Sequence, residues 1–175
     1  ERALELVKEA GVSRVVTPCP GCYRRLSLSW RSRVQIAHLV QFLAETLSEW
    51  RGELNRLEAR VAYHDPCDLG RRSGIYEEPR RILESIPGLE LVELELNREE
   101  CTCCGGGGML FAVEPELSIE IALEKIESEV LPLGVDYLAT ACPTCFRVLS
   151  YAAERAGADV EVVDLAELVY RALAG

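Results

Sequence analysis

The sequence lacks the features that several common functions require. Acidic residues exceed basic ones, and the formal net charge is -10 over 175 residues. A nucleic-acid-binding protein needs a basic face for the phosphates, so we expect no nucleic-acid partner. No apolar run approaches the length of a membrane span, and no basic-then-apolar signal peptide opens the chain. These absences favour a cytoplasmic protein, or one peripheral to a membrane-bound redox complex.

Signatures for the common redox cofactors are also missing. The glycine run 105–108 stands beside paired cysteines, which argues against a dinucleotide-binding loop. There is no nicotinamide or flavin signature and no Cys-x-x-Cys-x-x-Cys motif of the ferredoxin kind. A redox function would therefore need an electron donor from elsewhere.

Cysteine is the residue that stands out, because the chain has eight. Small secreted proteins use cysteines as disulfides, whereas intracellular chains more often use them for metal or redox chemistry. Hydrophobic residues make up 49% of this chain, which is enough to build a core without disulfide bonds. The cysteines therefore favour a metal or redox site.

Short apolar strands alternate with helices along the chain. This order predicts an α/β fold with a largely parallel sheet flanked by helices. Strands are predicted over 12–17, 60–64, 89–94 and 134–140. Helices are predicted over 1–10, 79–86 and 118–131, and two more are expected to begin near Tyr23 and at Phe146. Units of a strand followed by a helix are predicted over 34–42 and 160–169.

One stretch of sequence recurs 123 residues later, as Cys19-Pro20-x-Cys22 and Cys142-Pro143-x-Cys145 show. Flanking residues match at the same offset, which argues for an internal duplication. We expect residues 1–55 to be the C-terminal part of a truncated first repeat and residues 56–175 to be a complete second repeat. The chain would then be a fragment or a naturally shortened version of a two-repeat protein.

Five cysteines form one pattern: Cys67, then Cys103-Cys104 before Gly105, then Cys142 and Cys145. Each group lies where a strand gives way to a loop or helix, and such ends line up along one edge of a parallel sheet. Thiolates suit iron–sulfur clusters and zinc. A disulfide is disfavoured for the adjacent pair, because a bridge between neighbours is strained.

These motifs resemble the cysteine-rich CCG domain family, known from the B-type and D-type chains of heterodisulfide reductase. Iron–sulfur subunits of glycolate oxidase and of the glycerol-3-phosphate dehydrogenase C type resemble it too. The resemblance spans residues 60–170 and rests on the five cysteines, on His64-Asp65-Pro66 and on the glycine run. Cys19-Pro20-Gly21-Cys22 is similar to the end of a preceding family repeat.

The resemblance implies that Cys67, Cys103, Cys104, Cys142 and Cys145 ligate one [4Fe–4S] cluster, noncubane in heterodisulfide reductase. Zinc is the alternative metal. Cubane clusters take four cysteines, so a fifth leaves room for an exchangeable ligand or a substrate sulfur.

The other polar residues near these motifs carry weaker hypotheses. Cys19 and Cys22 are second-site candidates whose remaining ligands would lie upstream or on another subunit. An idle pair and a reversible disulfide are the alternatives. His64 is a weak candidate for a proton donor, and a role in ordering its loop is favoured. Cys101 lies outside the family pattern. It could be an occasional alternative ligand, but a partly buried free thiol is favoured. Arg71 and Arg72 follow Cys67 and could offset the charge of an anionic cluster.

Three functions follow. The first is an oxidoreductase subunit that takes electrons from a ferredoxin-like or flavin-containing redox subunit and reduces a disulfide, as in heterodisulfide reductase. The second is a non-catalytic electron-relay subunit of a flavin-linked dehydrogenase. The third is a zinc-stabilised structural module.

Overall fold

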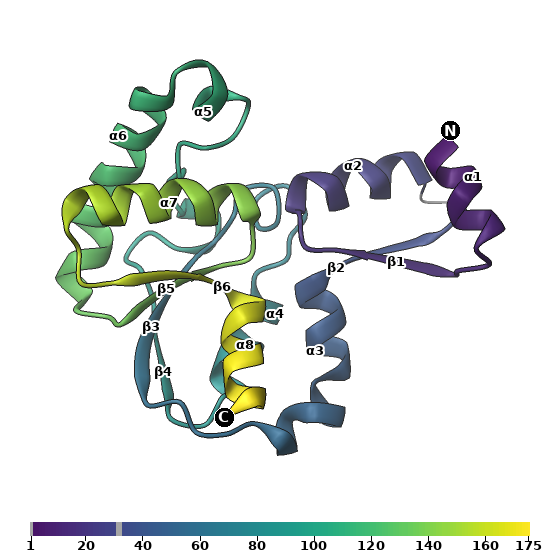
Figure 1. The fold of residues 1–175 in the computed structure, drawn as a ribbon, viewed down its shortest axis with the longest axis horizontal. Coiled ribbons are helices and arrows are strands. Elements are labelled where there is room, and N and C mark those ends of the chain that lie inside the picture. Colours follow the sequence, from purple (N-terminus) through teal and green to yellow (C-terminus); the bar gives the residue numbers. More distant parts are fainter. Residues whose placement is uncertain (1, 31–32) are drawn as a thin grey trace.

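The computed structural model describes residues 2–30 and 33–175, which contain two parallel sheets. The larger sheet has the strand order β4-β3-β5-β6, and the smaller pairs β1 with β2 (Figure 1). The strands are Arg14–Thr17 (β1), Gln35–His38 (β2), Ala59–His64 (β3), Leu89–Val92 (β4), Tyr137–Thr140 (β5) and Glu161–Asp164 (β6). The predicted α/β class with a parallel sheet is confirmed.

Helices connect these strands. They are Arg2–Glu9 (α1), Pro20–Trp30 (α2), Leu39–Trp50 (α3), Glu77–Ser85 (α4), Leu110–Val113 (α5), Pro115–Lys125 (α6), Pro143–Ala156 (α7) and Leu165–Ala174 (α8). Short 3-10 turns span Arg51–Glu53 (η1), Arg98–Glu100 (η2) and Leu131–Leu133 (η4), and a π-helical turn spans Ile126–Val130 (η3). Within the described ranges, every helix is too short or too polar to cross a bilayer.

Two helix starts differ from the prediction in a way that matters for the site. We expected helices from about Tyr23 and Phe146, but α2 begins at Pro20 and α7 at Pro143. Proline is favoured at the first helical position, because its fixed φ suits the helix and its missing amide hydrogen would be unpaired there anyway. Each Cys-x-x-Cys motif therefore lies at a helix N-terminus.

The predicted helix over 118–131 is also divided differently. The α-helix α6 runs over Pro115–Lys125, and the π-helical turn η3 and the 3-10 turn η4 complete the segment. Pro132 lies in η4, where it lacks the amide hydrogen that an α-helix would need.

The same order of elements occurs twice, as β1-α2-β2-α3 and as β5-α7-β6-α8. Equivalent helices are even capped alike. At the start of α3, His38 Nδ1 accepts a hydrogen bond from the Val40 amide at 3.3 Å. At the start of α8, Asp164 Oδ1 accepts one from the Ala166 amide at 2.9 Å. The domain boundaries at residues 55 and 56 remain a prediction.

Side chains of the larger sheet alternate between two buried faces. Val61 and Tyr63 of β3 pack with core residues of α3, α4 and α8, whereas Ala62 packs with core residues of α6 and α7. Figure 1 shows α7 on one side of this sheet and α8 with α3 on the other. Because α3 belongs to the core of the larger sheet, the N-terminal unit is packed into the rest of the chain.

The candidate site residues gather at the carboxyl edge of the larger sheet. Strands β3 and β5 are parallel neighbours in which His64 pairs with Thr140. The loop bearing Cys67 follows β3, and Cys142 follows β5. The segment after β4 is tied to this edge, because the Arg98 amide donates a hydrogen bond to Asp65 Oδ2 at 2.8 Å.

Candidate metal centre

One cavity of about 510 Å³ lies at this edge, and six cysteines line it. They are the five cysteines of the predicted ligand set, Cys67, Cys103, Cys104, Cys142 and Cys145, together with Cys19. Of the described cysteines, Cys22 and Cys101 are not among the residues of its wall. Four segments far apart in the sequence thus bring thiols to one space.

The pair Cys142 and Cys145 is placed by the N-terminus of α7. Cys142 is the N-cap residue and Cys145 lies buried in the first turn. A hydrogen bond with Cys145 and the backbone amides of Cys145 and Thr144 lower the pKa of Cys142 to about 7. Free amide hydrogens at a helix N-terminus stabilise a thiolate in this way.

The Cys103-Cys104-Gly105 segment wraps its sulfurs in backbone amides. The Gly105 amide donates to Cys103 Sγ at 3.3 Å, and the Gly106 amide donates to Cys104 Sγ at 3.4 Å. Gly105 has a φ of +80°, and a Cβ there would lie 2.6 Å from the Ser118 carbonyl oxygen. The motif therefore needs glycine for both its backbone angle and its close approach to α6.

The loop bearing Cys67 is held by a buried ion pair. Arg80 donates to both carboxylate oxygens of Asp65 at 2.9 Å, and side chains of both residues are almost fully buried. Asp65 also accepts from the Arg98 amide, as described above, so it joins the Cys67 loop to the segment that carries Cys103 and Cys104. Asp65 of the predicted His-Asp-Pro-Cys motif thus has a structural task.

Arg71 and Arg72 also have partners within the loops. Arg71 donates to the carbonyl oxygens of Glu99 at 2.8 Å and Cys101 at 2.9 Å. Arg72 pairs with Asp68 at 3.1 Å. Arg71 therefore braces the segment before Cys103, rather than supplying a free charge.

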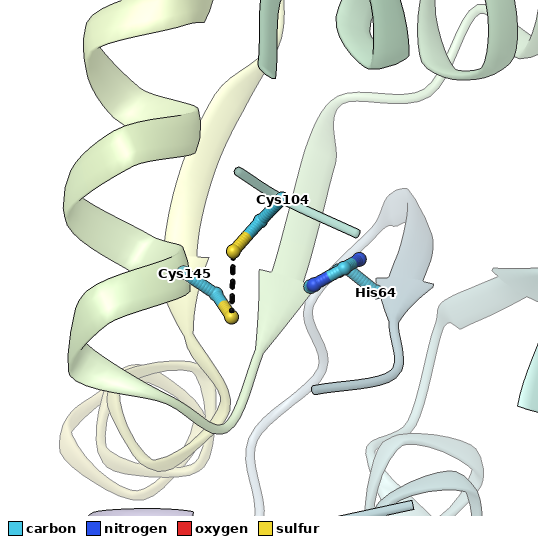
Figure 2. Close-up of side chains that lie close together, drawn as sticks. All are labelled: His64, Cys104 and Cys145. Carbon is cyan, nitrogen blue, oxygen red and sulfur yellow. Dashed lines mark hydrogen bonds between the residues drawn. The ribbon is translucent and has the colours of Figure 1, made fainter. Parts of the chain in front are cut away.

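His64 lies behind the thiols, buried at the end of β3. A ligand atom of its ring and the sulfurs of Cys104 and Cys145 lie within 4.8 Å of one another (Figure 2). The other near sulfur is Cys101 Sγ, 3.5 Å from Nδ1. Burial lowers the pKa of His64, but hydrogen bonds with Cys101 and Cys104 outweigh burial and raise this pKa to about 9.

Cys104 is the sulfur on which these interactions converge. Its Sγ lies 3.2 Å from Cys145 Sγ (Figure 2). Hydrogen bonds with Cys103 and Cys145, followed by the one with His64, hold the pKa of Cys104 far below its ordinary value. The same contacts raise the pKa of Cys103 and of Cys145. The site therefore favours negative charge on Cys104.

Cys101 is the neighbour that sequence reasoning placed outside the site. It is buried more fully than expected, at 4% exposed, and it contacts His64. Burial raises the pKa of Cys101, but His64 and Lys125 outweigh burial and lower it. Its position two residues before Cys103 was the available signal.

The first Cys-x-x-Cys motif has a different environment. Cys19 reaches the shared cavity, and its sulfur accepts from the Cys22 amide at 3.3 Å. Burial raises the pKa of Cys19, with further contributions from Cys22 and Cys142. Cys22 is exposed. The second-site hypothesis for this pair remains a prediction.

The outer wall of the cavity comes from a helix that the sequence did not predict, α5, and from α7. The Arg147 guanidinium lies 4.3 Å from the centroid of the Phe111 ring, and this ring stacks on Tyr151 at 5.8 Å. Met109 and Phe111 add apolar surface to the wall. The sequence carries no periodic signal for this helix, because it is only four residues long and follows the glycine run 105–108.

The donor set fits an iron–sulfur cluster. Six thiols line one cavity, and backbone amides donate to three of their sulfurs, those of Cys19, Cys103 and Cys104. Clusters are held by cysteine thiolates, and hydrogen bonds to the sulfurs tune them. Cys67, Cys103, Cys104, Cys142 and Cys145 are the residues that could hold such a group.

Fold and site together define a parallel α/β domain that gathers cysteines at the carboxyl edge of its sheet. A family model described as "Cysteine-rich domain" (CCG) matches residues 1–27 and 61–150. The chain belongs to this family, and the resemblance seen in its motifs is confirmed.

Curated relatives cover nearly all of the chain. It is 33% identical over 180 residues to the D-type chain of the heterodisulfide reductase of Methanosarcina barkeri, covering 97% of this chain and 43% of that relative. It is 35% identical to the B-type chain of the fumarate reductase (CoM/CoB) of Methanothermobacter marburgensis, covering 96% and 33%. A probable iron–sulfur-binding oxidoreductase, FadF of Bacillus subtilis, is 30% identical, covering 100% and 26%. The chain thus spans less than half the length of these relatives.

Proposed function

We propose that this chain binds one [4Fe–4S] cluster and transfers electrons as part of a larger oxidoreductase. The observation that carries the proposal is the single cavity lined by all five cysteines of the family pattern. Tertiary structure brings these thiols together from three separate parts of the second repeat. The names of the relatives, which describe iron–sulfur proteins and subunits of redox enzymes, support the same function.

Each surrounding residue has a task in this proposal. The bound cluster would accept and release single electrons. The amides of Gly105 and Gly106 donate to the ligand sulfurs, and the N-terminus of α7 favours thiolates at Cys142. A ferredoxin-like or flavin-containing subunit would supply the electrons, since the sequence carries no signature for such a donor.

A finer proposal is reduction of a disulfide, as in heterodisulfide reductase. Cleaving a disulfide into two thiols requires one electron and one proton for each sulfur. The cavity has space beside the five thiols, and Arg147 and Phe111 form its outer wall. The described residues of this wall do not include His64, which contacts Cys104 from behind. His64 therefore supports the thiolate of Cys104, and solvent at the cavity supplies the protons.

The first test is to reconstitute the chain anaerobically with iron and sulfide and to measure iron, acid-labile sulfide and zinc. We expect about four irons and four sulfides per chain, as a [4Fe–4S] cluster requires. Cys104→Ser should lose both. Cys101→Ser is the matched control and should retain both, because Cys101 lies outside the cavity wall. Equal loading of both variants would contradict the proposed ligand set.

Adding a thiol separates disulfide chemistry from a passive relay. After mild oxidation, a new EPR signal on thiol addition would support an exchangeable position and thus the disulfide reductase. An unchanged spectrum from a fully loaded cluster would favour the non-catalytic electron relay of a flavin-linked dehydrogenase.

Zinc is the second candidate, and one observation favours it. His64, Cys104 and Cys145 offer three donors within 4.8 Å of one another, which suits a single small ion. One tightly bound zinc per chain, with no sulfide after reconstitution, would replace the redox proposal by a zinc-stabilised structural module.

A further inference from the structure

Lysine is rare in this chain, and one of its two lysines is buried beside the cysteines. Lys125, at the end of α6, is 2% exposed, whereas Lys8 lies on the exposed helix α1. Burying an ammonium group costs free energy unless it is paired and hydrogen-bonded. The position of Lys125 therefore needs a physical explanation.

Lys125 is paired on one side and bound to the cysteine segment on the other. Its Nζ donates to Glu129 Oε2 at 2.6 Å and to Thr102 Oγ1 at 2.8 Å. The Thr102 hydroxyl in turn donates to Glu129 Oε1 at 2.5 Å. Both members of the ion pair are thus hydrogen-bonded to Thr102, the residue immediately before Cys103.

The π-helical turn brings the acidic partner into place. The turn η3 begins directly after Lys125 and contains Glu129, whose side chain is 14% exposed. Turns of this type are rare overall, but those that do occur often lie at functional sites. The pair is therefore built where the helix departs from regular geometry.

Short steps connect the ammonium group to the cluster ligands. Lys125 Nζ lies 4.0 Å from Cys101 Sγ, which lies 3.5 Å from His64 Nδ1. His64 approaches Cys104 and Cys145, as Figure 2 shows. On the other side, Lys125, Glu129 and Cys103 line a second cavity of about 460 Å³, so Cys103 borders both cavities.

We propose that the Lys125–Glu129 ion pair positions the Cys103-Cys104 segment and sets the reduction potential of the cluster that it holds. This inference rests on the proposed function. Reduction adds negative charge to the cluster, so a buried cation nearby favours the reduced state and raises the potential. The carboxylate of Glu129 opposes that effect. Removing the charge of Lys125 should therefore lower the reduction potential, and removing the charge of Glu129 should raise it.

The experiment compares Lys125→Met and Glu129→Gln in the reconstituted chain, with iron and sulfide analysis and an EPR-monitored redox titration. We expect full loading in both. The midpoint potential should fall in Lys125→Met and rise in Glu129→Gln. The midpoint potential of the double variant should lie between those of the two single variants. Lys125→Arg should have a midpoint potential near that of the unaltered chain, and Lys8→Met should have the same midpoint potential as the unaltered chain.

The outcomes separate this inference from the proposed function. Fully loaded variants whose potentials are unmoved, or move in the same direction, would overturn the inference alone. Loss of iron from both single variants, rescued in Lys125→Arg, would assign the pair a purely structural role and overturn its effect on potential. Failure of the unaltered chain to bind iron would overturn the proposed function, and this inference with it.

Discussion

Individual residues of the site act mainly by holding loops in place. Gly105 lets the backbone pass against α6, and Asp65 ties two loops together through Arg80 and the Arg98 amide. Neither residue offers a thiol, yet both decide where thiols lie. Substitutions at these positions should therefore disturb the whole site.

Gly105→Ala should destabilise the fold by about 2–4 kcal/mol, since it combines a left-handed backbone angle with overpacking. The matched control is Gly107→Ala. A Cβ at Gly107 meets no described atom within 4 Å, so a change of about 0.5 kcal/mol or less is expected there. Urea unfolding of both variants measures the difference, and equal effects would contradict the packing argument.

Asp65→Asn should lower the free energy of unfolding by about 1.5–3 kcal/mol, because the buried Arg80 keeps its ion pair with Glu93 but loses its charged partner Asp65. Asp68→Asn serves as the control, since Asp68 pairs with the more exposed Arg72. An exposed pair contributes about 1 kcal/mol or less. Chemical denaturation gives both free energies of unfolding, and a small loss in Asp65→Asn would refute the anchoring role.

Among the elements, the two helices that begin with Cys-x-x-Cys motifs show how similar sequences acquire different chemistry. In α7, hydrogen bonds lower the pKa of Cys142 to about 7. In the equivalent position of α2, burial raises the pKa of Cys19 above its ordinary value. Burial raises the pKa of both thiols, so the difference arises from the neighbouring thiol: the hydrogen bond with Cys145 lowers the pKa of Cys142, whereas the hydrogen bond with Cys22 raises the pKa of Cys19.

Alkylation against pH tests this contrast in the chain prepared without iron. A thiol reacts as its thiolate, so reactivity rises as pH passes its pKa. Cys142 should therefore become reactive around pH 7, and Cys19 only at a pH above the ordinary thiol range. Peptide mapping by mass spectrometry separates the two sites. Cys145→Ala should move the Cys142 midpoint upward, because it removes the main cause of the shift. Coincident midpoints for Cys19 and Cys142 would contradict the proposed contrast.

Across the whole molecule, the N-terminal unit and the larger sheet share one core. Val40 and Ala44 of α3 pack in the same cluster as Tyr63 of β3 and Leu168 of α8. Cys19 also reaches the cavity that is lined mainly by residues 66–148. The two predicted repeats should therefore unfold together.

Val40→Ala should lower the free energy of unfolding of the whole chain by about 2 kcal/mol, as expected for a truncated buried side chain. The exposed Val12 offers the control, where Val12→Ala should have little effect. Circular dichroism and tryptophan fluorescence should report one coincident transition. Two separate transitions, with only one affected by Val40→Ala, would indicate independent domains.

The linear sequence was sufficient for the features that depend on neighbouring residues. Alternating strands and helices predicted the parallel α/β fold. Cys67, the Cys-Cys-Gly motif and the second Cys-x-x-Cys motif predicted five of the six thiols that line the cavity. Such patterns are readable because backbone geometry repeats over a few residues. The short helix α5 and the π-helical turn η3 were missed, since glycines and an unusual hydrogen-bond pattern carry no periodic signal.

Contacts between distant segments were decided by folding alone. Lys125 is buried against Thr102, and His64 contacts Cys101 across 37 positions. Asp65 meets Arg80 through a buried pair, and Cys19 joins the cavity of the second repeat. Each of these contacts requires two chain segments to pack together, and the energy of a buried charge or thiol depends on that environment. The sequence therefore named the candidate ligands, and the packing at the sheet edge determined which of their thiols have a raised or lowered pKa.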